Sequence, residues 1–306
     1  MSEYHVPIML DEVMDSLGVK AGGIYLDGTT GGGGHSEAIL RRGGKTVCID
    51  RDDEALTESR KRFESEGLTG YTLVKSDFRA AAKVLDDLGI DFIDGALLDL
   101  GISSHQIDEP SRGFSYRFDG RLDMRMDESQ PLSAYEVVND YDERELERIL
   151  FTYGEERFAR KIVANIVKER AQAPIETTQQ LVEIIRRSTP AFYQRQGHPA
   201  KKTFQAIRIE VNGELEGLKE GIESIAERIK SGGRFAIITF HSLEDRIVKQ
   251  TFRLMCTDCI CDKSLPVCVC GHKATAKAAG KFKPDENELK TNTRSASATL
   301  RVIEKL

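Results

Sequence analysis

The sequence predicts an α/β fold with a parallel, doubly wound sheet that is interrupted by a helical insertion. Short apolar runs alternate with helical segments over the first hundred residues. This alternation stops between about Ser103 and Ile207, where apolar residues recur at helical spacing, and it returns afterwards. Buried strands separated by helices are typical of a parallel sheet with helices on both faces.

The first half of the predicted core supplies four strands. Each is a short apolar run, and the four are Ile24–Asp27, Thr46–Asp50, Tyr71–Val74 and Gly95–Leu100. Helices are expected between them at His35–Arg42, which Gly43 and Gly44 stop, and at Glu54–Glu66.

The helical insertion is expected to span residues 106–207, which leaves residues 1–105 and 208–306 as a discontinuous core. Within it, Thr177 or Thr178 caps a helix that Pro190 ends. After it, Gly232 and Gly233 are expected to halt a helix. The elements predicted there are a helix at Glu214–Ile229, a strand at Arg234–Phe240, a helix at Ser242–Phe252 and a strand at Thr299–Ile303.

Composition indicates an ordinary globular protein, with 40% hydrophobic and 31% charged residues among 306. No apolar run is long enough to span a membrane, and the N-terminus lacks the pattern of a signal peptide, so we expect a cytoplasmic protein without a membrane partner. The net charge of −6 argues against bulk binding of nucleic acid. However, Ile184–Ile209 and Gly271–Pro284 contain basic but no acidic residues. Either run alone can be a solvated surface, whereas two together favour an anionic partner.

The loop after the first strand, Asp27–Gly34 (DGTTGGGG), is the segment that says most about chemistry. Glycine lets the backbone turn sharply and approach a ligand, and the following helix begins with free N–H groups, although a tight turn alone also requires glycine. Asp50 ends the second strand, where an acidic side chain can hold ribose hydroxyls. A dinucleotide and S-adenosylmethionine both fit. An acidic Asp27 repels pyrophosphate but tolerates a sulfonium, which favours S-adenosylmethionine.

The fourth strand brings Asp99, in LLDLGISSHQ, to the carboxyl edge of the sheet, where ligands bind in doubly wound folds. For an isolated Asp, a role in a helix cap or turn is the simpler interpretation. The alternative is that Asp99 lies beside the reactive end of the cofactor.

Long sequence strings of one known family occur in order along the chain: HVPIMLDEV, YLDGTTGGGGHS, IDRD, LLDLGISSHQID, RGFSYRFDGRLDMRMD, YGEERFARKIVANIV, HPAKKTFQAIRIEVNGEL, TFHSLEDRIVK and RSASATLRV. In these strings the chain resembles the bacterial 16S rRNA cytosine-N4 methyltransferases, the small-subunit methyltransferase H family. The resemblance implies a Rossmann-like class I S-adenosylmethionine methyltransferase core with an inserted helical domain that recognises RNA. It also implies S-adenosyl-L-methionine as donor and the N4 amine of a decoding-centre cytidine in the small ribosomal subunit as acceptor.

By matching positions, the resemblance implies a cofactor site. Its residues would be Gly33, Gly34, His35, Asp50, Phe78, Asp99 and Gln106. Asp50 can accept hydrogen bonds from the ribose and Phe78 can pack on the adenine. Backbone N–H groups of the loop can bind the carboxylate end of the cofactor. We expect a monomer or a homodimer that acts on 16S rRNA in an assembled small subunit.

Asp99 is the predicted catalytic residue. An exocyclic cytosine amine is a poor nucleophile, so positioning and electrostatics should do most of the work. Other amino-group methyltransferases resemble each other in an Asp-Pro-Pro-aromatic motif at this strand end, whereas this chain has Asp99, Leu100, Gly101 and Ile102. Stacking on the base must then come from elsewhere, and the candidates, which can equally be core residues, are Phe114, Tyr116 and Phe118.

Further polar candidates lie near these motifs. Ser103, Ser104 and His241 are neighbours to test, with a structural role at the end of the fifth strand favoured for His241. Four arginines alternate with acidic residues, so some should form internal ion pairs and others can reach phosphate; they are Arg112, Arg117, Arg121 and Arg125.

Five of the six cysteines fall within fifteen residues, and only Cys48, in a buried strand, is separate. In a cytosolic chain, closely spaced cysteines indicate metal binding before disulfide formation. The four expected zinc ligands are Cys259, Cys261, Cys268 and Cys270. A reduced loop without metal is the alternative.

Two other functions remain open from the sequence. One is a nicotinamide-dependent oxidoreductase, since the glycine loop alone also fits a dinucleotide. The other is a non-catalytic RNA-binding or assembly factor that keeps the fold. The intact loop, Asp50 and Asp99 favour an enzyme.

Overall fold

The computed structural model describes residues 7–262, 265 and 267–306, and the chain divides into two compact units. Unit 1 comprises Met1–Gly101 and Glu216–Leu306, and unit 2 comprises Ile102–Leu215. Unit 2 thus begins earlier and ends later than the sequence predicts. Its last helix, α11 (Lys201–Asn212), is continuous and contributes to the core of unit 2 along its length, which moves the boundary past residue 207.

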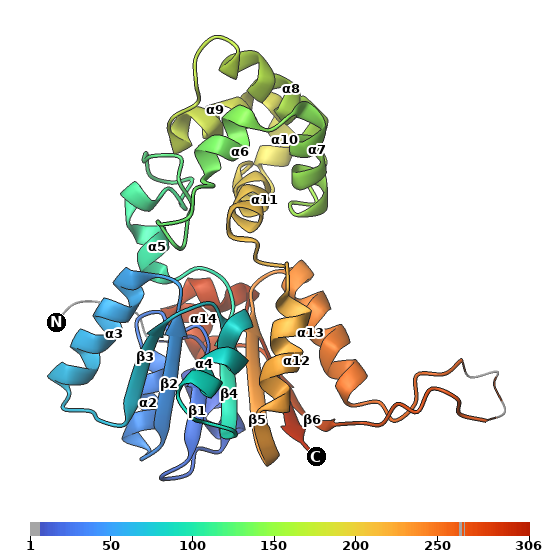
Figure 1. The fold of residues 1–306 in the computed structure, drawn as a ribbon. Coiled ribbons are helices and arrows are strands. Elements are labelled where there is room, and N and C mark those ends of the chain that lie inside the picture. Colours follow the sequence, from blue (N-terminus) through green and yellow to red (C-terminus); the bar gives the residue numbers. More distant parts are fainter. Residues whose placement is uncertain (1–6, 263–264, 266) are drawn as a thin grey trace. The chain divides into compact units, whose positions relative to one another are not determined.

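Unit 1 is built on a seven-stranded sheet with strand order β3-β2-β1-β4-β5-β7-β6 (Figure 1). The strands are β1 (Ile24–Asp27), β2 (Lys45–Asp50), β3 (Tyr71–Lys75), β4 (Ile93–Asp99), β5 (Ile229–Thr239), β6 (Ala276–Phe282) and β7 (Thr299–Lys305). Strands β1 to β5 are parallel to one another, whereas β7 is antiparallel to both of its neighbours, β5 and β6. The predicted Rossmann-like fold class is therefore confirmed, but the sheet is mixed rather than wholly parallel.

Helices cover both faces of the sheet because the central strands are apolar on both sides. Leu97 of β4 packs with α1 and α2, whereas its neighbour Leu98 packs with α4, α12 and α13 on the opposite face. The helices of unit 1 are α1 (Leu10–Leu17), α2 (Gly34–Arg41), α3 (Asp53–Ser65), α4 (Ala81–Asp87), α12 (Leu218–Glu227), α13 (Ser242–Met255) and α14 (Glu286–Thr291). No helix in the described part of the chain is long and apolar enough to cross a membrane.

The predicted helix Glu214–Ile229 and its glycine stop are wrong in detail. Helix α12 begins only after Gly217, whose φ of 64° is left-handed, and it ends at Glu227. Gly232 and Gly233 lie inside β5 instead. A Cβ on Gly233 would lie 2.7 Å from the carbonyl oxygen of Asp94, so glycine is needed there for close strand contact rather than to end a helix.

Strand β6 was not predicted. Its residues are mostly Ala, Lys and Gly, and only Ala276 is buried, so the segment lacks the apolar pattern of a strand. It forms because β7 offers it an antiparallel partner at the edge of the sheet.

Unit 2 is helical and has a core of its own. Its helices are α5 (Ser104–Asp108), α6 (Ala134–Asp140), α7 (Glu143–Thr152), α8 (Ala159–Arg170), α9 (Thr178–Ser188), α10 (Ala191–Gln194) and α11. Thr177 caps α9, because its hydroxyl accepts a hydrogen bond from the N–H of Gln180. Fully buried side chains such as Leu146, Ile162 and Ile185 fill the space between these helices.

Candidate cofactor and catalytic site

The glycine loop between β1 and α2 is held against the ends of two neighbouring strands. The N–H of Gly28 donates to the carbonyl of Leu97 in β4 (3.0 Å), and the N–H of Thr30 donates to that of Ile49 in β2 (3.0 Å). A Cβ on Gly28 would lie 2.5 Å from the Leu98 side chain. The loop therefore lies across the carboxyl edge of the sheet, as its sequence position predicts.

Two glycines of the loop are required by close packing. Gly33 has a φ of 77°, and a Cβ there would lie 2.8 Å from Ser59 Oγ and 2.9 Å from the Phe63 ring. A Cβ on Gly34 would lie 2.9 Å from the ring of Pro7. Gly33 is the N-cap of α2 and makes no side-chain cap hydrogen bond, and the N–H groups of Gly34 and His35 make no hydrogen bond to the described residues. These N–H groups can bind an anionic group.

Asp50 fixes the loop from the end of β2. Its Oδ2 accepts from the N–H of Gly31 (2.8 Å), and its Oδ1 accepts from the N–H of Asp52 (2.9 Å). Burial raises the pKa of Asp50 to about 6, although these two hydrogen bonds oppose the shift. Each carboxylate oxygen keeps a further lone pair, so Asp50 can still accept from hydroxyl groups.

Asp27 lies at the end of β1 and is buried. The hydroxyl of Ser36 donates to its Oδ2 at 2.7 Å. Burial raises the pKa of Asp27 to about 6, against the lowering effect of the hydrogen bond from Ser36. The residue is thus a structural part of the loop and also a source of negative charge near the site.

Asp99 ends β4 with a carboxyl oxygen that lacks a partner. Its backbone N–H donates to Thr29 Oγ1 (2.6 Å), which orients the residue. The side chain is 24% exposed, yet its Oδ1 is buried and makes no hydrogen bond within the described part of the chain. Burial, followed by the charges of Asp27, Glu244 and Glu288, raises the pKa of Asp99 to about 8. An orphaned oxygen and a strongly raised pKa are features of a functional site.

His35 packs beside Asp99 from the first turn of α2. Its Nε2 lies 3.0 Å from the carbonyl oxygen of Ile8, and since a carbonyl only accepts, Nε2 carries the proton of the neutral ring. Burial lowers the pKa of His35 to about 4. Its Nδ1 lies 3.9 Å from Asp99 Oδ2, but a neutral ring and a largely protonated carboxyl group do not form an ion pair at neutral pH.

Phe78 lies next to the loop, in the turn after β3. A Cβ on Gly28 would come 3.1 Å from Phe78 Cβ, and a Cβ on Gly221 of α12 would come 3.0 Å from its ring. The ring is half-buried and packs against the core. Next to it, burial would raise the pKa of Asp77, but hydrogen bonds from Arg79 and the charge of Arg51 lower it to about 2.

Two acidic residues near Asp99 were not predicted from the sequence. Glu244 is buried in α13 and accepts from the N–H of Phe240, and Glu288 in α14 accepts from the N–H of Met9 (2.8 Å). The TFHSLED segment contains the spacing of a capping box, which could have indicated Glu244. His241 is the cap of α13, the structural role that its position favoured.

Gln106 and Ser103 belong to unit 2. The Ser103 hydroxyl accepts from the N–H of Gln106, and Gln106 Oε1 accepts from the N–H of Ser103, which makes a capping box at the start of α5. Ser104 is the first residue of that helix. The assignment of Gln106 to a cofactor site stays a prediction.

The three aromatic candidates for base stacking differ in their surroundings. Phe114 is buried in the core of unit 2. Tyr116 stacks on His198, with ring centroids 4.3 Å apart. Phe118 is 46% exposed and is therefore the one whose face is open to a ligand.

The four alternating arginines differ in their surroundings, and Arg117 is exposed. Arg112 is buried and donates to the carbonyls of Arg125 and Met126, so it is structural. Arg125 pairs with Asp123 (2.7 Å). Arg121 is 71% exposed and only loosely paired, at 4.0 Å, with the same carboxylate. Arg121 can therefore reach an external phosphate.

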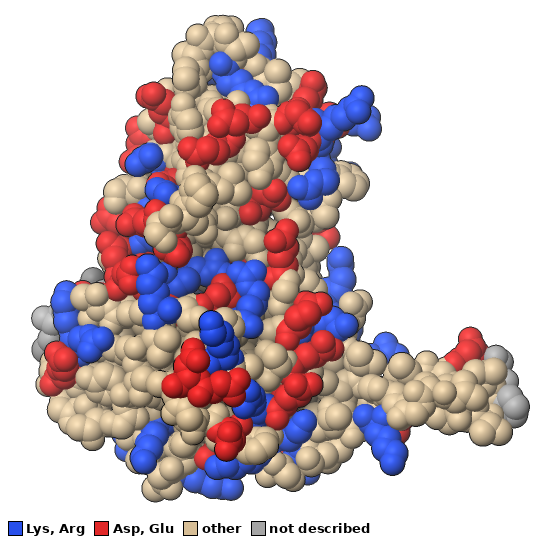
Figure 2. Space-filling view, in the orientation of Figure 1, with Lys and Arg blue, Asp and Glu red and all other residues tan. Residues whose placement is uncertain are grey.

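The two basic runs are partly neutralised in three dimensions. Arg186, Arg187 and Arg208 pair with acidic residues outside the first run, and Lys277 of the second pairs with Glu304. Figure 2 shows positive and negative side chains interspersed over the face in view. A segment free of acids in the sequence is thus not a uniformly positive surface.

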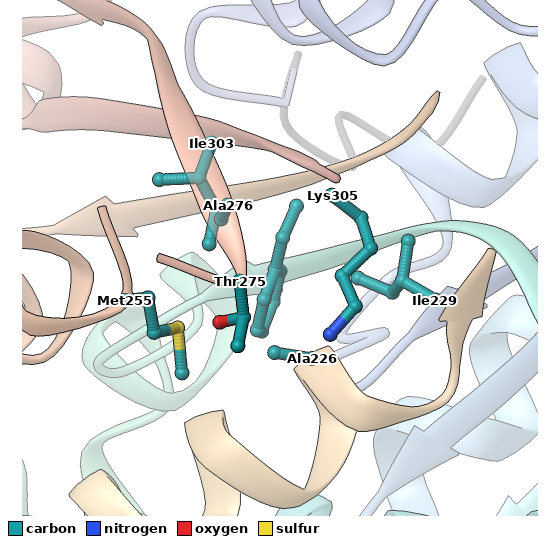
Figure 3. Close-up of a pocket in the computed structure, with 8 residues that line it drawn as sticks. Ala226, Ile229, Met255, Thr275, Ala276, Ile303 and Lys305 are labelled. Atoms are coloured by element: carbon teal, nitrogen blue, oxygen red, sulfur yellow. The ribbon is translucent and has the colours of Figure 1, made fainter. Parts of the chain in front are cut away.

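A small cavity in unit 1 lies away from the candidate site. It is lined mainly by apolar side chains, and Figure 3 shows Ile229, Met255 and Ile303 among them. Ile229 begins β5 and Ile303 lies near the end of the antiparallel β7, so the cavity is at the amino edge of the parallel strands. Of its lining residues only Lys305 is charged, and no candidate site residue contributes to it.

Comparison with known proteins identifies the family. The model of the MraW methylase family matches residues 2–306. The chain is 48% identical to the ribosomal RNA small subunit methyltransferase H of Brevibacillus brevis, over 100% of this chain and 99% of the relative. It is 50% identical to the proteins of that name from Carboxydothermus hydrogenoformans (99% and 98% covered) and Clostridium botulinum strain Kyoto (99% and 99%). The chain therefore belongs to the MraW methylase family.

Proposed function

We propose that this protein transfers the methyl group of S-adenosyl-L-methionine to the N4 amine of a decoding-centre cytidine in 16S rRNA of the small ribosomal subunit. The shared name of its relatives supports small-subunit rRNA as the substrate. The observation that carries the proposal is the buried Oδ1 of Asp99, which lies beside the glycine loop and has no hydrogen-bond partner among the described residues.

The charge around Asp99 favours a cationic ligand. Asp27, Glu244 and Glu288 all raise its pKa, so this edge of the sheet is rich in carboxyl groups. A sulfonium group is attracted to such a site, whereas the pyrophosphate of a dinucleotide is repelled. This argument supports S-adenosyl-L-methionine over a nicotinamide cofactor.

The other loop residues suit the rest of that molecule. The N–H groups of Gly34 and His35 lie at the start of α2 and can bind the carboxylate of its amino-acid part. Asp50 can accept from ribose hydroxyls, and Phe78 offers an aromatic edge for the adenine. When bound, S-adenosyl-L-methionine supplies an electrophilic methyl group.

In the proposed reaction Asp99 orients the target amine. Its carboxyl group, which is 24% exposed, accepts a hydrogen bond from the exocyclic amine and aligns it for attack. The amine loses a proton when it gains the methyl group, and a carboxylate with a pKa of about 8 is suited to take that proton near neutral pH. No step of this reaction uses the clustered cysteines, for which the sequence predicts a structural zinc.

Unit 2 is proposed to recognise the RNA. The target base must leave its stack before an enzyme can methylate it, and an aromatic side chain can replace the lost stacking. Phe118 is the exposed candidate, and Arg121 can contact phosphate.

The test is a methyl-transfer assay on small ribosomal subunits from a strain that lacks the enzyme. Purified protein and radiolabelled S-adenosyl-L-methionine are added, and the nucleosides of the digested rRNA are resolved by mass spectrometry. We expect label in N4-methylcytidine, and we expect Asp99→Ala to abolish it while S-adenosylhomocysteine, which has no sulfonium charge, still binds.

The other functions give different results in the same assay. A non-catalytic RNA-binding or assembly factor would bind subunits without leaving label on subunits, free rRNA or precursor particles. A nicotinamide-dependent enzyme would bind a dinucleotide in preference to S-adenosyl-L-methionine. Label in a nucleoside other than N4-methylcytidine would support methyltransferase activity but would show that the target is not the N4 amine of cytidine.

A further inference from the structure

Residues 256–275 join α13 to β6 (Figure 1), and we call this segment the cysteine arm. Four of its cysteines lie close together. They are Cys259, Cys261, Cys268 and Cys270, and their sulfur atoms all lie within 4.8 Å of one another. Cys268 Sγ lies 3.5 Å from that of Cys259 and 3.6 Å from that of Cys270. It lies 4.0 Å from that of Cys261. A disulfide needs about 2.05 Å, so the four are free thiols.

We propose that these four side chains bind one Zn²⁺ ion in a tetrahedral, all-thiolate site. A Zn–S bond is about 2.3 Å long, which places tetrahedral sulfur ligands about 3.8 Å apart. The separations around Cys268 scatter about this value, and Cys270 Sγ lies 3.8 Å from Cys259 Sγ. The sulfur atoms thus already have the spacing of one bound zinc ion.

The described part of the arm has no hydrophobic core that would otherwise hold this arrangement. Among the described residues between Met255 and Ala276, none is buried. Its large apolar side chains face solvent, with Val267 69% and Val269 76% exposed. A segment without a core needs another source of folding free energy, and a structural zinc provides one.

Contacts around the sulfur atoms agree with a four-sulfur ligand set. The N–H of Val269 donates to Cys261 Sγ (3.3 Å), as backbone amides do to metal-bound thiolates. His272 follows the last cysteine, but its Nε2 bonds the carbonyl of Leu254 in α13 (2.9 Å). This contact anchors the base of the arm and leaves coordination to the cysteines.

The spacing also selects among metals. Four cysteines in tetrahedral geometry suit either a single zinc ion or an iron–sulfur cluster. A cluster places several iron and sulfide atoms between its cysteines and spreads them further apart than around a single ion. Sulfur atoms within 4.8 Å of one another fit the single ion.

The experiment measures metal in the full-length protein. Protein produced with zinc and purified under reducing conditions is expected to contain about one zinc per chain by mass spectrometry. Cys259→Ser and Cys268→Ser should lower this content at least about tenfold. Cys256→Ser, a change at the end of α13 and outside the cluster, is the matched control and should keep the metal. Replacement by Co²⁺ should give the absorption bands of a tetrahedral cobalt–thiolate site.

A second readout does not depend on metal content at purification. Metal-free, reduced protein should take up one equivalent of zinc, and zinc should slow proteolysis within residues 256–275 at least about tenfold. The cluster variants should still bind S-adenosyl-L-methionine, which shows that they fold. Three results would overturn the proposal. Reduced protein could fail to take up zinc, the purified protein could contain iron with acid-labile sulfide instead of zinc, or both cluster variants could retain zinc.

Discussion

His35 and Asp99 meet with Nδ1 3.9 Å from Oδ2, and both groups are largely uncharged at neutral pH. Burial lowers the pKa of His35 to about 4, and burial with neighbouring carboxylates raises that of Asp99 to about 8. The centre of the candidate site is therefore close to neutral until a ligand arrives. Its response to pH and to ligand charge can be predicted from this.

Asp99 should make the protein less stable as pH rises. The unfolded carboxyl group loses its proton near its ordinary pKa of 3.8, whereas the folded one keeps it to about pH 8. Between these values the folded state binds more protons, so the free energy of unfolding falls with increasing pH. Asp99→Asn cannot ionise, and its stability relative to the parent should rise from pH 5 to pH 8 by at most about 1.4 kcal/mol per unit. Urea unfolding at several pH values measures this difference.

Asp27 and Asp50 also have raised pKa values, but both proteins retain them, so the difference between the two curves isolates Asp99. Parallel stability curves for parent and variant would show that Asp99 ionises normally in the folded state.

Binding of S-adenosyl-L-methionine should strengthen with pH. Its sulfonium is attracted to the ionised form of Asp99, so its affinity should rise between pH 6 and pH 8, by at most about tenfold per unit. S-adenosylhomocysteine has no such charge, so its affinity should depend less on pH. In Asp99→Asn the affinities of the two ligands should have the same pH dependence. Calorimetry is the suitable measurement because the chain has no tryptophan. Equal pH dependence for both ligands would contradict the placement of the sulfonium at Asp99.

Gly33→Ala should destabilise the loop more than an ordinary glycine substitution. The left-handed φ of 77° costs an alanine about 1–2 kcal/mol, and its Cβ would also clash with Ser59 and Phe63. Gly67→Ala is the matched control, because its φ of 63° is similar but nothing lies within 4 Å of the added carbon. We expect a further loss of about 1–3 kcal/mol for Gly33→Ala and weaker cofactor binding. Urea unfolding measures the loss of stability and calorimetry measures cofactor affinity. Equal losses of stability for Gly33→Ala and Gly67→Ala would show that Ser59 and Phe63 move aside without cost.

Phe118→Ala should impair methylation of RNA without affecting cofactor binding. Stacking of a base on an aromatic ring contributes about 1–3 kcal/mol, so kcat/KM on small subunits should fall about 5- to 150-fold. Phe151→Ala removes another exposed ring of unit 2, 70% exposed against 46%, and should leave activity unchanged. If Phe118→Ala and Phe151→Ala lose the same activity, or if neither loses any, Phe118 does not stack on the base.

Most of the sheet follows from the sequence because its strands are buried on both faces. Leu97 and Leu98 point to helices on opposite faces of the sheet. A strand that is buried on both faces has a continuous apolar sequence, and this pattern identifies it. Strand β6 has no such signal, since only its pairing with β7 at the edge makes it a strand. The prediction that Gly233 ends a helix was wrong for a related reason. Glycine is needed there because the backbone approaches Asp94, and this contact depends on strand pairing that the local sequence does not show.

The positions of the site residues are predictable where they depend on strand ends. Asp27, Asp50 and Asp99 each end a parallel strand, and such ends share one edge of a sheet. Glu244 and Glu288 come from distant helices, and their effect on Asp99 follows from tertiary packing that no local pattern encodes. The same applies to the orphaned state of Asp99 Oδ1, which depends on every neighbour at once.

The chain interruption between β4 and β5 has a consequence for biosynthesis. Leu97 pairs with Ala236, yet the whole of unit 2 is translated between them. The nascent chain therefore carries β4 with one open edge until β5 leaves the ribosome, and exposed strand edges invite mispairing. Because unit 2 has its own core, its early folding would shorten the flexible loop that must close and lower the entropic cost of joining the two halves. We expect truncated chains that end before residue 229 to aggregate unless chaperones protect that edge.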